Sequence, residues 1–146
     1  MNNLLLGLCL VALPACAQPA AQPVKLYSSA ADAQALIAQA RAEHKGGNTV
    51  KIIGNTPGYP VQLEFRTSTT PASVHPVQDE LIEVIGGGCT LITGGTLTSA
   101  KTIEGGSARK VTKGDYVVVP ANTPHQYTDI QGGELITVAV HYPKAN

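Results

Sequence analysis

Short apolar and alternating segments, separated by turns rich in glycine and proline, run through most of the chain. Residues 61–66 (VQLEFR) alternate apolar and polar positions, and residues 116–119 (YVVV) are rich in β-branched side chains. Both patterns are typical of strands. We predict strands at residues 50–53, 61–66, 81–85, 89–93, 116–119, 125–130 and 135–142, with a hairpin or long loop over residues 96–109. This spacing predicts an all-β sandwich or barrel.

One segment has the spacing of a helix instead. Ser29 with Asp32 three residues later resembles a capping box. Apolar residues at positions 33, 36, 37 and 40 then share one narrow helical face, and Gly46 and Gly47 end the pattern. We predict one helix that packs on the outside of the larger β-structure.

The first residues have the pattern of an export signal. Residues 4–13 form an apolar run of ten, whereas a membrane-spanning helix needs about 20 residues. Pro14 and small residues follow, and two processing routes stay open. Ala15-Cys16-Ala17 is an A-x-A-like cleavage site, while residues 13–16 (LPAC) also resemble a lipoprotein box that would give Cys16 a lipid anchor. We therefore expect an exported protein, periplasmic or secreted, or alternatively a lipoprotein anchored to the membrane.

These patterns divide the chain into an export signal (residues 1–17), a tether with the helix (18–48) and one barrel domain (49–146). Ten prolines, fifteen glycines, one phenylalanine and no tryptophan agree with short strands and tight turns. Ten basic residues balance ten acidic ones, and no basic stripe with interleaved aromatic residues occurs. A nucleic-acid partner is therefore not expected. Cys89 is expected to be a small buried hydrophobe.

Two stretches carry the chemistry. In residues 114–125 (GDYVVVPANTPH), Pro120 and Pro124 bracket Asn122, which tolerates left-handed backbone angles. This stiff turn delivers His125 at a fixed angle. In residues 75–87 (HPVQDELIEVIGG), His75 precedes Glu80 by five residues, and the strand that follows ends in a glycine turn.

Together these stretches resemble the two motifs of the cupin superfamily, over roughly residues 60–142. Gly114, Pro120 and His125 match Gly-x5-Pro-x-Gly-x2-His, with Asn122 in place of the second glycine. The other motif, His-x-His-x3-4-Glu-x6-Gly, is matched by a single histidine together with its glutamate and glycine. The missing histidine corresponds to Ser73 if His75 holds the second position of the motif, or to Val77 if His75 holds the first. Strand alternation does not decide between them, since positions 73, 75 and 77 share one face of a strand.

The resemblance implies a jelly-roll barrel whose cavity holds a divalent metal ion on His75, Glu80 and His125. Two histidines and one carboxylate suit Fe(II) or Mn(II), and zinc with an additional water is also allowed; nickel is a further candidate. The expected partner is a small organic molecule, the expected reaction that of an oxygenase, isomerase or lyase, and the expected assembly a dimer. The alternative is a metal-free barrel that acts as a binding or structural module, with His125 as a core histidine. Whether the chain is an enzyme is left open.

Other polar residues receive weaker predictions. Tyr127 lies on the same strand face as His125 and is a candidate cavity hydroxyl. His141 either lines the cavity as an acid or base or lies at the barrel rim. Asp79 is expected to point away from Glu80. His44 and Arg66 are expected to be solvated.

Overall fold

The computed structural model describes residues 23–144. The export signal over residues 1–17, the lipid-anchor alternative at Cys16 and the start of the tether lie outside the described residues. Within residues 23–144, no helix is long and apolar enough to cross a membrane.

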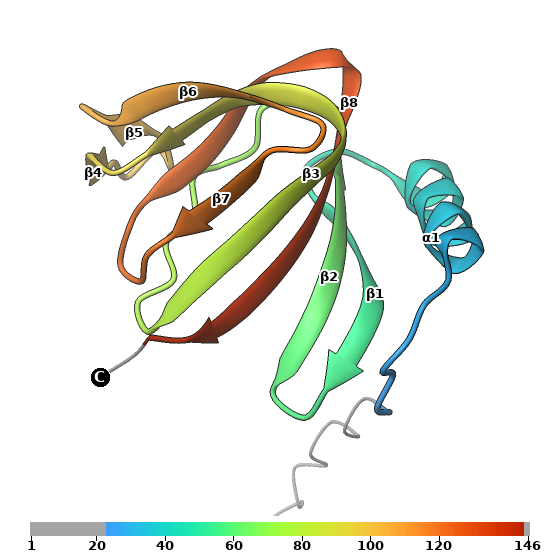
Figure 1. Ribbon diagram of the computed structural model, residues 1–146. Helices are drawn as coiled ribbons and strands as arrows, with labels where there is room; N and C mark the ends of the chain where they lie inside the picture. Colours follow the sequence, from blue (N-terminus) through green and yellow to red (C-terminus); the bar gives the residue numbers. More distant parts are fainter. Residues whose placement is uncertain (1–22, 145–146) are drawn as a thin grey trace, which may run out of the picture.

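The described chain folds into a twisted antiparallel β-barrel with one helix outside it (Figure 1). Strands β1, β2, β8, β3 and β6 are hydrogen-bonded in this order, β7 also pairs with β3, and β4 and β5 form a separate pair. The all-β jelly-roll prediction is confirmed. The elements are α1 (Ala30–Glu43), β1 (Thr49–Thr56), β2 (Tyr59–Arg66), β3 (Gln78–Thr93), β4 (Thr96–Leu97), β5 (Ile103–Glu104), β6 (Ser107–Thr112), β7 (Tyr116–Val119) and β8 (His125–Pro143).

The predicted strand ends were wrong at two glycine runs. Segments 81–85 and 89–93 form the single strand β3, and segments 125–130 and 135–142 form the single strand β8. The pairing register between β3 and β8 shifts around Gly86, Gly87 and Gly88. Gly87 has a φ of 69°, so the glycines bend the paired strands without interrupting them. The predicted hairpin or loop over residues 96–109 contains the short β4–β5 hairpin, and its last residues belong to the polar strand β6, which pairs with β3.

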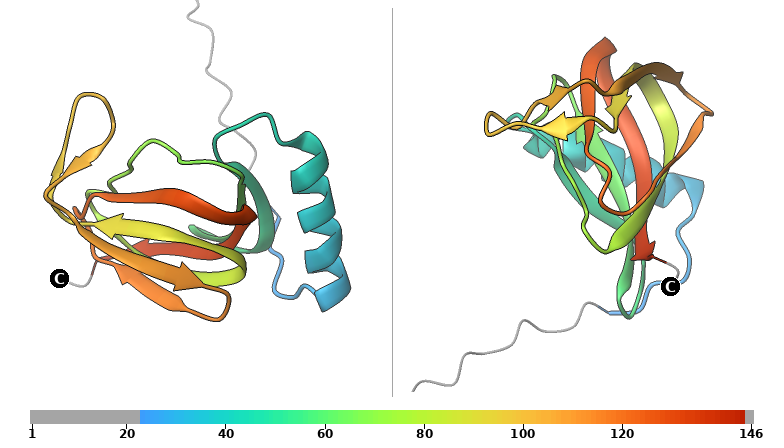
Figure 2. Two further views of the ribbon diagram at one scale, coloured as in Figure 1. Left: turned by 90° about the horizontal axis from the view of Figure 1, so that it is seen from above. Right: turned by 90° about the vertical axis from the view of Figure 1, so that its left-hand side faces the viewer.

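Two apolar clusters stabilise the fold. One is formed by residues of β3, β6, β7 and β8 and includes Ile82, Leu91 and the fully buried Cys89, whose thiol is free as expected. The other lies between α1 and the barrel, where Ile37 and Ala40 pack with Leu63 and Phe65 of β2 and with Ile136. Figure 2 shows α1 lying along the outside of the barrel. Because Leu63 and Phe65 face the helix, the alternate residues of β2 face the barrel interior.

Both ends of α1 are fixed by side chains. The Ser29 hydroxyl accepts from the Asp32 backbone N–H and the Asp32 carboxylate accepts from the Ser29 N–H, which confirms the capping box. His44 at the other end was predicted to be solvated, but it is half-buried and both of its ring nitrogens have partners. Its ring nitrogens lie 2.9 Å from the hydroxyl oxygens of Thr49 and Thr67. His44 therefore fastens the end of α1 to the barrel.

Candidate metal centre

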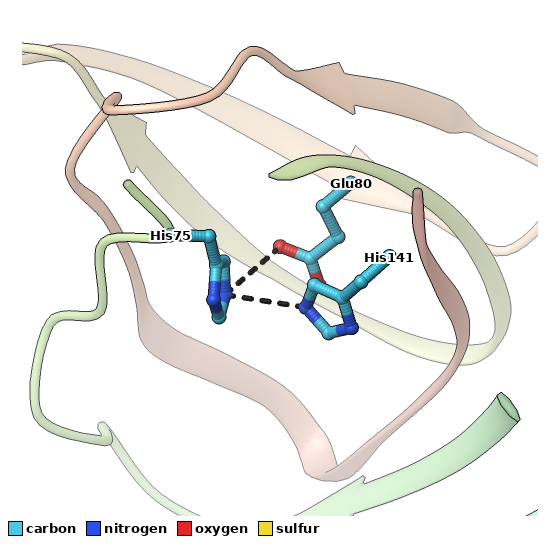
Figure 3. A group of neighbouring side chains, drawn as sticks. All are labelled: His75, Glu80 and His141. Atoms are coloured by element: carbon cyan, nitrogen blue, oxygen red, sulfur yellow. Dashed lines mark hydrogen bonds and ion pairs between the residues drawn. The ribbon is translucent and has the colours of Figure 1, made fainter. Parts of the chain in front are cut away.

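Three ionisable side chains from different parts of the chain meet inside the barrel (Figure 3). His75 comes from the loop before β3, Glu80 from β3 and His141 from β8. Their ligand atoms all lie within 4.8 Å of one another. His141 Nε2 lies 3.2 Å from His75 Nε2 and 3.5 Å from Glu80 Oε1, and His75 Nε2 lies 3.8 Å from Glu80 Oε2. Glu80 and His141 are direct cross-strand partners, which explains why they share a face.

His125, the first residue of β8, adds a fourth side chain to this group. Its Nε2 lies 3.2 Å from Glu80 Oε2, and the side chain is 4 % exposed. Its Nδ1 lies 3.3 Å from the carbonyl oxygen of Thr123. A carbonyl oxygen can only accept, so Nδ1 carries the proton and Nε2 presents its lone pair to Glu80. We name the four residues His75, Glu80, His125 and His141 the histidine–glutamate cluster.

Backbone hydrogen bonds hold the two predicted motifs against each other. The N–H of Asn122 donates to the carbonyl of His75 at 2.7 Å, and Ser73 and His125 exchange two backbone hydrogen bonds of 2.9 Å. Asn122 has a φ of 61°, in agreement with the left-handed conformation expected there. The stiff turn thus positions both His125, which follows it, and His75, which it contacts.

Asp79 points away from the cluster, as strand alternation predicts. Its Oδ1 accepts a 2.7 Å hydrogen bond from the backbone N–H of Ala121, which belongs to the turn before His125. Neighbouring residues of β3 therefore have separate roles: Glu80 faces the cavity and Asp79 holds the turn that bears His125.

The electrostatics of the cluster favour a cation. Burial, with the nearby charge of Glu64, raises the pKa of Glu80 to about 7, and burial lowers the pKa values of His75, His125 and His141. Near neutral pH the contacts thus join a partly protonated carboxyl group to neutral imidazoles rather than forming fixed ion pairs. Glu80 Oε2 is buried and has no hydrogen-bond partner among the described residues. A divalent cation would use this oxygen and the imidazole lone pairs together, so the donor set fits such an ion.

The structure brings together all three predicted metal ligands and adds His141 to them. The sequence pattern placed His141 at the rim or in the cavity, and the structure places it in the cavity beside His75. The first motif supplies one histidine fewer than the usual pattern, and His141 from β8 adds a histidine to the cluster from another strand. Its only sequence signal was strand alternation, since the pairing of β3 with β8 is not visible in the sequence.

The histidine–glutamate cluster lies in a cavity of about 320 Å³. Tyr127 lines this cavity, as predicted, and its ring is perpendicular to that of His125 at a centroid distance of 6.4 Å. The Tyr127 hydroxyl is buried and lacks a hydrogen-bond partner among the described residues. Burial raises its pKa well above the ordinary value, so the phenol stays protonated and can donate a hydrogen bond.

The same cavity contains a buried ion pair. Arg66 was predicted to be solvated, but the whole residue is only 6 % exposed because the polar face of β2 looks into the barrel. Its Nη2 donates to Glu64 Oε2 at 2.9 Å, and Glu64 also accepts from Asn48 and Thr137. Burial opposes ionisation of Glu64, but the charge of Arg66 and these hydrogen bonds lower its pKa overall.

No family model matches the sequence, and no curated protein matches it. Solved structures do resemble the fold. A protein from Ralstonia eutropha JMP134, provisionally assigned as a mannose-6-phosphate isomerase, is 21% identical over 71% of this chain and 94% of its own, with a TM-score of 0.54. The Fe(II) form of HppE is 16% identical over 65% of this chain and 50% of its own, with a TM-score of 0.54.

Oxalate oxidase in complex with glycolate is 21% identical over 70% of this chain and 54% of its own, with a TM-score of 0.53. This chain therefore spans about half the length of two of these three proteins. At such identities the likeness concerns the fold alone, and it shows that the described chain has the cupin fold expected from its two motifs.

Proposed function

We propose that this protein binds one divalent metal ion on the histidine–glutamate cluster and a small organic molecule beside it in the cavity. The observation that carries this proposal is the buried Glu80 carboxyl group, which has imidazole Nε2 atoms at 3.2, 3.5 and 3.8 Å. Imidazole and carboxylate donors together suit iron, manganese, nickel or zinc.

We further propose a metal-dependent reaction on that small molecule, of the oxygenase, isomerase or lyase type. A bound ion would polarise a substrate oxygen or activate dioxygen. The chain's own contribution is then to hold the donors and exclude bulk water. The Tyr127 hydroxyl can donate a hydrogen bond toward a ligand, since no described residue accepts from it.

Elemental analysis tests the metal proposal. The mature protein, purified without a histidine tag, is compared with His75→Ala and His125→Ala. His44→Gln is a matched control, because His44 is the one histidine of the chain's four that lies outside the cluster, at the end of α1. We expect near-stoichiometric metal in the wild type and in the control, and loss of metal in both alanine variants. Metal-free protein after anaerobic reconstitution would contradict the proposal.

A metal-free binding module is the second candidate, and one observation favours it. The raised pKa of Glu80 allows a proton to take the place of a cation in the cluster. A module of this kind would bind its ligand with the same affinity in the presence and absence of a chelator, whereas the metal-dependent protein would lose affinity.

A further inference from the structure

Arg66 has more hydrogen-bonding capacity than its neighbours use. Its Nη2 donates to Glu64 and its Nη1 makes a long 3.5 Å hydrogen bond to Thr137. Its Nε is buried and has no partner among the described residues. A guanidinium group carries five N–H donors, and a buried donor that stays unpaired is costly. The unpaired Nε–H of a side chain buried in a cavity wall is therefore a candidate ligand contact.

Arg66 also lies between two cavities. The first, of about 320 Å³, contains the histidine–glutamate cluster, and the second has a volume of about 420 Å³. Arg66, Asn48, Thr70 and Ser73 line both cavities. An elongated ligand could thus extend from the metal centre past Arg66 into the second cavity.

The two cavities differ in charge. The first is lined by the carboxyl groups of Glu64 and Glu80, whereas within residues 23–144 the ionisable residues that line the second are Arg66 and Lys101. Lys101 is placed there by a tight turn, in which it has a φ of 60° and its carbonyl accepts from the N–H of Ala72 at 2.7 Å. The second cavity is therefore lined by an exposed cation, Lys101, and by a buried one, Arg66, whose acidic partner Glu64 lies on the side of the first cavity.

We propose that the second cavity binds the anionic group, a carboxylate or a phosphate, of a ligand whose opposite end reaches the metal centre. The substrate class would be small acids with an oxygen-chelating head and a second, distal anion. This proposal rests on the proposed function for the head of the ligand only. The anion is recognised by Arg66 and Lys101, neither of which belongs to the histidine–glutamate cluster. A neutral ligand would leave Lys101 without an anionic partner in this cavity and Arg66 with Glu64 alone.

Paired probes test this proposal by calorimetry. 2-Hydroxyglutarate and 2-hydroxyvalerate share a chelating head, and only the former has a distal carboxylate. 3-Phosphoglycerate and glycerate form the corresponding pair for a phosphate. We expect the distal anion to increase affinity about tenfold in at least one pair, the scale of a hydrogen bond to a charged group. The pair that shows the difference identifies the carboxylate or the phosphate as the preferred group.

Two variants locate the effect. Lys101→Gln should reduce the affinity for the doubly charged probe about threefold, as expected for an exposed cation, and leave its singly charged partner unchanged. Lys113→Gln, another exposed lysine, is the control. The double variant Glu64→Gln/Arg66→Gln removes the buried ion pair as a unit, which avoids an unpaired buried charge. It should reduce the preference for the distal anion to the roughly threefold part that Lys101 supplies, with its folding checked by circular dichroism.

Metal content is measured in the same samples, which separates this proposal from the proposed function. Equal affinity within both pairs overturns the anion site even when metal is bound, and so does the absence of binding by all four probes. Protein without metal refutes the metal centre. In that case inorganic phosphate serves as the probe, and binding weakened by Lys101→Gln still supports the anion site, whereas no binding overturns it.

Discussion

The imidazoles of His141 and His75 meet at 3.2 Å between their Nε2 atoms, although 66 residues separate them in the chain. Only one proton can lie between the two nitrogens, so a hydrogen bond between the neutral rings requires one of them to carry its proton on Nε2. A shared cation uses both lone pairs instead. Because Glu80 is the strand partner of His141 and lies beside His75, His141 lies among the candidate ligands in the cavity rather than at the barrel rim.

We predict that His141→Ala weakens metal binding as strongly as His75→Ala. Changing a residue that merely supports a ligand typically costs 10–100-fold in metal affinity, so loss of a direct ligand should cost about 100-fold or more. Competition with a chromophoric chelator measures the affinity, with His44→Gln as the control. Wild-type affinity in His141→Ala would instead leave His141 with the role of an acid or base beside the metal.

The pKa of Glu80 predicts a pH-dependent stability for the metal-free protein. Burial raises this pKa from 4.5 in the unfolded reference to about 7 in the fold. The neutral carboxyl group is therefore favoured in the folded state. Its contribution is complete below pH 4.5 and is lost as the pH rises through about 7. The difference in pKa corresponds to about 3 kcal/mol.

Urea unfolding in the presence of a chelator measures this effect, with Glu80→Gln as a neutral isostere. The lowered histidine pKa values act in the opposite sense, removing stability as the pH falls below 6.5, but they are present in both proteins. We expect the stability of the wild type relative to Glu80→Gln to fall by about 3 kcal/mol between about pH 5 and about pH 8. Added metal should reverse the trend. A pH-independent difference would contradict the raised pKa.

The motif spacing predicted the parts of the site that lie close together in sequence. Glycine, proline and asparagine determine the backbone of the turn before His125, and strand alternation separates Glu80 from Asp79. His141 was harder to assign, because its partner depends on the register between β3 and β8. That register shifts at a bulge near Gly87, which sequence periodicity does not reveal.

Arg66 shows a second limit of alternation. The pattern of β2 distinguishes two faces of the strand without showing which face looks into the barrel. Leu63 and Phe65 pack against α1, so the polar face with Glu64 and Arg66 turns inward. An apolar outer face covered by a helix and a polar inner face lining a cavity reverse the usual expectation for a half-buried strand.

The hydrogen bond from the Ala121 N–H to Asp79 predicts that a residue outside the cluster affects metal binding. Asp79→Ala removes the acceptor that holds the turn before His125. We expect a loss of about 1–2 kcal/mol in the free energy of unfolding, the scale of such a hydrogen bond. We also expect weaker metal binding, because His125 loses its fixed position. Asp79→Asn keeps an acceptor oxygen and should retain most of the stability and most of the metal affinity. Similar losses in Asp79→Ala and Asp79→Asn would argue for a role of the Asp79 charge instead.

The bulge at Gly87 predicts a coupling between fold and site. A Cβ on Gly87 would overlap the backbone carbonyl oxygen of Glu134, and its φ of 69° disfavours other residues. Gly87→Ala should therefore cost about 3 kcal/mol or more in the free energy of unfolding, from backbone strain and overpacking together. Gly114→Ala is the control: its φ of 95° is also positive, but its Cβ would meet no atom within 4 Å. Strain alone should cost it about 1–2 kcal/mol.

Gly87→Ala should also weaken metal binding, because residues of the histidine–glutamate cluster lie on both sides of the bulge. Glu80 pairs with His141 on one side, whereas His125 pairs with Thr93 on the other. A displaced bulge changes the distance from His125 to Glu80 and leaves the pairing of Glu80 with His141 in place. We therefore expect Gly87→Ala, under conditions where it stays folded, to lose metal affinity to the extent that His125→Ala does. Adding His125→Ala to Gly87→Ala should then cause little further loss. Additive losses would show that the bulge acts on stability alone.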